Sequence, residues 1–76
     1  MITVEAVSVG DRFYWNFIPG AFYRLDNKKN PPILYDADGD IWAVKRISDA
    51  EYVIDICESY YAKFIELDKK VEKNAG

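Results

Sequence analysis

The sequence predicts a small, mostly β protein: a partly open antiparallel barrel of five or six strands, with a helical element near the C-terminus. Apolar and polar residues alternate in several short runs, and turn signals such as Pro19-Gly20 and Asp38-Gly39 separate those runs. Aromatic residues make up 16% of the 76 residues. A chain this short buries only about 60% of the surface that it exposes when unfolded, so large rings must supply the core. We expect one domain over residues 1–67, followed by a charged tail, 68–76, that frays.

The N-terminal part predicts two strands around a tight turn, followed by a third strand. Apolar residues alternate from Ile2 to Ala6 and again from Phe13 to Phe17, with Gly10-Asp11 between the two runs. Pro19-Gly20 is a strong turn signal, and the β-rich run from Ala21 to Leu25 follows it.

The middle of the chain predicts an exposed loop and then a hairpin. The polar stretch 26–32 (DNKKNPP) ends in two prolines, which disfavours a regular element and indicates a loop. Ile33–Tyr35 then begins a strand, and its hairpin partner is expected from Ile41 to Ile47.

The C-terminal part allows two interpretations. In the first, Tyr52–Ile56 is a strand, residues 57–62 (CESYYA) form a short helical turn, and residues 63–67 (KFIEL) close the barrel. In the second, a long helix runs from Asp49 to about Lys73 and packs on an antiparallel sheet, which gives an α+β fold. Ser48 and Glu51 have the spacing of a capping box. Apolar residues also recur at steps of three and four, at Val53, Cys57, Tyr60, Phe64, Leu67 and Val71.

The order of these segments resembles small Src-homology-3-like barrels. The segments are VSVGDRFY, then FYRL after Pro-Gly, then the hairpin ILYDADGDIWAV, then FIEL, and together they span residues 7–67. Barrels of this kind are common among short proteins of phages and other mobile elements, so the resemblance implies a phage-type protein. The acidic ALYDY motif of proline-peptide binders is not matched, because Leu34-Tyr35-Asp36 lies in mid-chain before a tight turn. We therefore expect no proline-peptide groove.

Composition favours a cytoplasmic, non-enzymatic protein. The single cysteine, Cys57, permits no internal disulfide, and neither a signal peptide nor a membrane span is predicted. The chain has no histidine, so the commonest general base near neutral pH is absent, and its glycines are too dispersed for a phosphate loop. Cys57 lies beside Glu58, which disfavours a thiolate, so we expect a buried structural thiol. No cofactor is expected.

Asp36, Asp38 and Asp40 have the spacing that begins a calcium-binding EF-hand loop. The remainder of that motif is missing, because Ile41 occupies the glycine position and Ile47 occupies the glutamate position. Asp38-Gly39 between β-rich segments is instead typical of a hairpin turn, and no metal site is predicted.

Both faces of the predicted strand 41–47 carry apolar side chains, which predicts an interaction surface. One face holds Ile41 and Ala43, and the other holds Trp42 and Val44, so one face needs a cover. The cover could be the C-terminal segment of the chain or an external protein, including a second copy. We expect Trp42, Phe22 and Tyr14 to act as aromatic anchors, with Asp36, Asp38 and Asp40 as an acidic rim. By analogy, the chain would be a phage-type accessory protein or an inhibitor of a host protein or defence complex.

A single-stranded nucleic-acid platform is the alternative function. Such a platform needs basic residues among exposed rings on a β surface. The candidate cations are Arg12, Arg24, Lys45 and Arg46. The net charge of −3 and the many aspartates disfavour this alternative.

Overall fold

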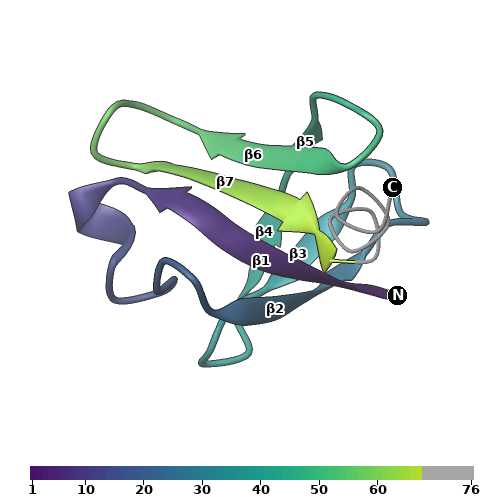
Figure 1. Ribbon diagram of the computed structural model, residues 1–76, viewed down its shortest axis with the longest axis horizontal. Helices are drawn as coiled ribbons and strands as arrows, with labels where there is room; N and C mark the ends of the chain where they lie inside the picture. Colours follow the sequence, from purple (N-terminus) through teal and green to yellow (C-terminus); the bar gives the residue numbers. More distant parts are fainter. Residues whose placement is uncertain (68–76) are drawn as a thin grey trace, which may run out of the picture.

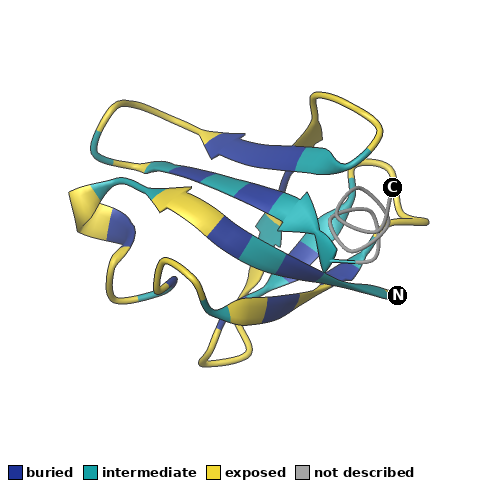
Figure 2. Cartoon of the chain, viewed as in Figure 1, coloured by how far each residue is buried: buried dark blue, intermediate teal, exposed yellow. Residues whose placement is uncertain are grey.

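The computed structural model describes residues 1–67 and confirms a mostly β, antiparallel fold (Figure 1). Its strands are short and joined by exposed connections (Figure 2). The elements are β1 (Ile2–Val9), the 3-10 turn η1 (Asp11–Phe13), β2 (Phe22–Asp26), β3 (Ile33–Tyr35), β4 (Ile41–Ala43), β5 (Lys45–Arg46), β6 (Glu51–Asp55) and β7 (Tyr61–Glu66).

The seven strands form one nearly closed barrel in the order β4-β3-β2-β1-β7-β6-β5. The first and last strands of this order are separated in sequence only by Val44, which is buried. Trp42 of β4 pairs with Leu34 of β3, whereas Arg46 of β5 pairs with Tyr52 of β6. The expected single strand 41–47 is therefore divided at Val44, and this division accounts for seven strands where five or six were expected.

Alternation along the strands places one face of the sheet in the core. Val4 and Ala6 of β1 are fully buried, as are Leu25 of β2 and Phe64 of β7. Figure 2 shows the resulting bands of buried residues along the strands. A register shift between Ala6 and Ser8 in the pairing of β1 with β7 places Val7 at a β-bulge, where it is exposed.

The predicted strand from Phe13 to Phe17 is wrong. The chain instead turns helically, and the backbone N–H of Phe17 donates to the carbonyl of Phe13 at 2.8 Å. Residues four apart lie on the same side of such a turn, so Phe13 and Phe17 are both fully buried while Trp15 between them faces solvent. An alternating pattern and a spacing of four both fit these two phenylalanines, and only the position of Trp15 distinguishes a strand from a turn.

The long C-terminal helix is also wrong, as is the short helical turn expected at residues 57–62. Strands β6 and β7 form a hairpin, and residues 56–60 are bends that connect them. β6 buries Tyr52, Val53 and Ile54 in succession, and this burial outweighs the helical spacing of the apolar residues. The end of the expected helix and the expected charged tail, 68–76, lie outside the described residues.

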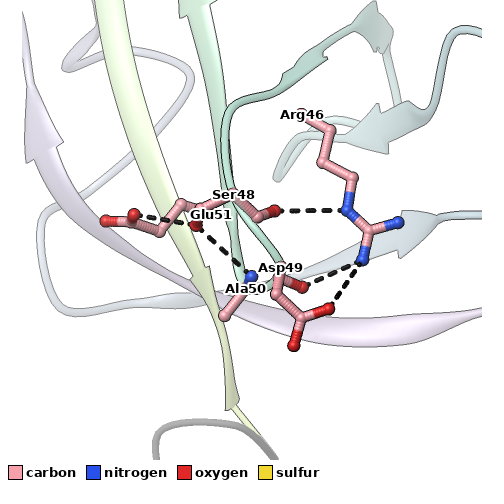
Figure 3. Close-up of polar contacts among 5 residues, drawn as sticks. All are labelled: Arg46, Ser48, Asp49, Ala50 and Glu51. Atoms are coloured by element: carbon pink, nitrogen blue, oxygen red, sulfur yellow. Dashed lines mark hydrogen bonds and ion pairs between the residues drawn. The ribbon is translucent and has the colours of Figure 1, made fainter.

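The predicted capping-box residues Ser48 and Glu51 interact, but they stabilise a turn between β5 and β6 (Figure 3). The hydroxyl of Ser48 donates to Glu51 at 2.8 Å, and the backbone N–H of Ala50 donates to that hydroxyl at 3.4 Å. The Arg46 guanidinium donates to the carbonyls of Ser48 and Asp49. The same side-chain chemistry that caps helices thus serves a hairpin turn here.

Candidate functional site

Three connections meet at one end of the barrel, which we call the aromatic end: residues 10–21, 36–40 and 56–60. Because the strands are antiparallel, the β1–β2, β3–β4 and β6–β7 connections all lie at the same end of the strands (Figure 1). Two hydrogen bonds join them. The backbone N–H of Arg12 donates to the carbonyl of Ser59 at 3.2 Å, and the side-chain amide of Asn16 donates to Asp36 at 3.1 Å.

Phe13 and Phe17 fix the first connection to the core. Both rings are fully buried, and they meet edge to face with centroids 5.5 Å apart. The ring of Phe17 also contacts Tyr23 at 5.3 Å and Phe64 at 5.0 Å, and Phe13 contacts Trp42 at 5.2 Å. Edge-to-face contacts of this kind are favourable beyond the area that they bury. The backbone between the two phenylalanines is thereby held at both ends.

The first connection also exposes three large apolar residues, Tyr14, Trp15 and Ile18, which we call the Trp15 cluster. Their exposed fractions are 56%, 91% and 61%. Indole is among the largest apolar side chains, and an almost fully exposed indole has a large area to lose on contact with a partner. Neighbouring exposed apolar groups in one place are typical of an interaction surface.

The third connection adds an aromatic residue that packs against the first connection. The ring of Tyr60 packs edge to face on Phe13 at 5.3 Å, and the Arg12 guanidinium lies 5.9 Å from the centre of the Tyr60 ring. Ile56 is exposed in the same connection. The expectation of a buried Cys57 is wrong: the thiol is exposed, because β6 ends at Asp55 and residue 57 lies in the connection.

The acidic turn is organised by Asp36, whose carboxylate accepts four hydrogen bonds. One oxygen accepts the backbone N–H groups of Asp38 at 3.0 Å and Asp40 at 2.9 Å. The other accepts the indole N–H of Trp42 at 2.9 Å and the amide of Asn16 at 3.1 Å. Gly39 has a φ of +86°, the conformation that favours glycine in a tight turn. These bonds are those of a hairpin turn, as the sequence predicted.

The same contacts set the ionisation of Asp36. Burial by itself would raise the pKa of this carboxyl, but the hydrogen bonds from Trp42, Asn16 and the backbone outweigh burial and lower the pKa. The carboxylate oxygens of Asp36, Asp38 and Asp40 lie within 4.8 Å of one another. Because both oxygens of Asp36 already accept two hydrogen bonds each, this carboxylate is engaged in the turn, and we do not assign a metal site to it.

The predicted aromatic anchors fall in different places. Tyr14 belongs to the Trp15 cluster, and Phe22, 59% exposed, begins β2 directly after the first connection. Trp42 is half-buried and faces inward, where its ring contacts Phe13 and Phe17. On β4 it is Ile41 that faces outward. Among the predicted rim residues, Asp38 and Asp40 are exposed, whereas Asp36 is buried.

The four candidate nucleic-acid cations do not gather on one surface. Arg12 lies at the aromatic end beside Tyr60, and Arg24 lies on β2, opposite Thr3 and Tyr35 in the sheet. Lys45 and Arg46 lie on β5, where the Arg46 guanidinium packs 5.7 Å from the centre of the Tyr52 ring and binds the adjoining turn.

Trp15 and Ile18 were absent from the sequence-predicted site. The alternating interpretation of residues 13–17 placed Trp15 on the buried face with Phe13 and Phe17. A signal was nevertheless present, because Phe13 and Phe17 are four residues apart and Pro19-Gly20 follows within one turn. That spacing fits a short helical turn with its middle residues outward as well as it fits a strand, so by itself it does not choose between them.

Comparisons with known protein families, with curated proteins and with solved structures find no match for this chain. The resemblance to Src-homology-3-like barrels therefore stays an expectation. Among residues 1–67, no helix combines the length and the apolar character needed to cross a membrane.

Proposed function

We propose that the protein is a small non-enzymatic interaction module that binds another protein through its aromatic end. The observation that carries this proposal is the Trp15 cluster, three exposed apolar side chains on a segment that two fully buried phenylalanines hold in place. Tyr14 and Phe22 remain in the proposed surface as first expected. Trp15 and Ile18 take the place that Trp42 had in the sequence interpretation.

The physical basis is the energetics of protein interfaces. A few Trp and Tyr residues at the centre of an interface commonly supply most of the binding free energy. Ordering a flexible segment on binding costs conformational entropy and so opposes association. This cost is small where the backbone is already fixed in the free protein. Phe13 and Phe17, with their hydrogen bond of 2.8 Å, fulfil this condition for Tyr14 and Trp15.

In its finer form, the proposal is a phage-type accessory protein or inhibitor that occupies a surface of a host protein or defence complex in the cytoplasm. That form rests on the resemblance to small Src-homology-3-like barrels. We do not favour single-stranded nucleic acid as the ligand, because Arg12, Arg24, Lys45 and Arg46 lack a common surface.

The test is capture of binding proteins from an extract of the source cells, with the wild-type chain and Trp15→Ala immobilised in parallel. Lys28→Ala, in the connection at the opposite end of the barrel, is the matched surface control. We expect proteins that the wild type and Lys28→Ala retain and that Trp15→Ala loses. The proposal fails if the retained proteins are the same for all three. It also fails if single-stranded oligonucleotides quench tryptophan fluorescence in a salt-sensitive way while no protein is retained.

A further inference from the structure

We infer that the aromatic end binds a basic protein segment that carries apolar side chains. This inference rests on the proposed function and specifies the chemistry of the partner. It follows from the charges of the three connections at the aromatic end, which have one predominant sign.

All three connections of the aromatic end contribute exposed carboxylates. Asp11 begins η1, Asp38 and Asp40 lie in the β3–β4 turn, and Glu58 lies in the β6–β7 connection. Among residues 1–67, none of these four carboxylates forms an ion pair with a lysine or arginine. We call Asp11, Asp38, Asp40 and Glu58 the carboxylate ring.

The only cation in the three connections is Arg12, which lies against the Tyr60 ring. Two lysines, Lys28 and Lys29, are exposed in the connection from β2 to β3, which lies at the opposite end of the barrel. Negative charge therefore predominates in the three connections of the aromatic end, where Trp15 is exposed. Such a distribution orients and attracts a partner of positive charge.

An exposed indole and exposed carboxylates at the same end of the barrel favour some partners over others. A phosphate backbone or an acidic protein surface would be repelled by the carboxylate ring. A second copy of this chain, docked through the same end, would bring two carboxylate rings of like charge together. The face therefore does not fit a symmetric dimer. A lysine- or arginine-rich segment can form ion pairs with the carboxylate ring, and its cations can also stack on the face of Trp15. Its apolar side chains would cover Tyr14 and Ile18.

The experiment is a selection from a display library of random 12-residue peptides against the immobilised wild-type chain, followed by synthesis of the selected peptides. We expect the peptides to combine Lys or Arg with apolar residues. Their affinity should fall about tenfold between 50 and 300 mM salt, because screening weakens exposed charge pairs. It should fall at least as far in Trp15→Ala and in the combined variant Asp11→Asn, Asp38→Asn, Asp40→Asn, Glu58→Gln.

A matched variant at the opposite end, Lys28→Gln with Lys29→Gln, should leave the affinity within about twofold. Thermal unfolding of each variant establishes that the fold is retained. Neutral or acidic peptides that depend on Trp15 but not on the carboxylate ring would overturn the inference and leave the proposed function standing. A selection that yields no peptide dependent on Trp15 would overturn both.

Discussion

The indole N–H of Trp42 donates to the carboxylate of Asp36 across 2.9 Å. This bond ties the inward face of β4 to the turn that precedes it, while Asn16 ties the same carboxylate to the first connection. Asp36 is thus the point at which two connections of the aromatic end are held together. Trp42 and Asp36 thus hold the neighbours of Trp15, because Trp42 contacts Phe13 and Phe17 and Asp36 accepts the hydrogen bond of Asn16.

Replacing Asp36 with Asn should destabilise the fold by about 2–3 kcal/mol. An amide can accept hydrogen bonds only at its oxygen, so at least one buried donor among those of Trp42, Asn16 and the turn would lose its partner. Urea denaturation followed by circular dichroism measures the change. Asp38→Asn, an exposed neighbour in the same turn, should stay within about 0.5 kcal/mol of the wild type. Equal effects of the two variants would contradict this role of Asp36.

The stability should also depend on the ionisation of Asp36. Its pKa in the folded protein is lowered from the ordinary value of 3.8, so its contribution is present above pH 3.8 and is lost as the pH falls through the lowered pKa. The difference in free energy of unfolding between the wild type and Asp36→Asn should therefore shrink below pH 3.8. A difference that stays constant through this range would show that the pKa is not lowered.

Truncation should destabilise the protein strongly at Phe17 and very little at Trp15, although the two residues lie two positions apart. Phe17→Ala removes a fully buried ring and should cost about 3–5 kcal/mol. Trp15→Ala removes a ring that is 91% exposed and should change the free energy of unfolding by less than about 0.5 kcal/mol. Denaturant titrations of both variants measure these changes in the free energy of unfolding. A large loss in Trp15→Ala would place its indole in the core and remove the basis of the proposed surface.

Gly10 and Gly39 should reject side chains for different reasons. A Cβ at Gly10 would overlap the backbone carbonyl of Ser59, so Gly10→Ala should cost about 1–3 kcal/mol through crowding. Gly39 has open space around it but a φ of +86°, so Gly39→Ala should cost about 1–2 kcal/mol through backbone strain. Asparagine tolerates positive φ better than alanine does. Melting temperatures should therefore recover in Gly39→Asn and stay low in Gly10→Asn.

Several elements of the fold could be predicted from local patterns. The turn at Asp38-Gly39, the strand Ile33–Tyr35 and the strand after Pro19-Gly20 are present in the structure, since alternation and turn chemistry act over a few residues. The helical turn at residues 13–17 could not be separated from a strand in this way. Both conformations bury Phe13 and Phe17, and the choice depends on rings that arrive from elsewhere in the sequence, such as Phe64.

The sequence by itself determined that this protein is mostly β, that aromatic residues form much of its core, and that Asp38-Gly39 makes a turn. These features follow from residue type and short-range order. Only the tertiary structure decided that Glu51–Asp55 is a strand, that Trp42 faces inward and that Trp15 faces outward. The physical reason is that burial is a property of the closed barrel. Which side of each segment is covered depends on strands that are distant in the sequence, and the exposed surface is whatever that closure leaves uncovered.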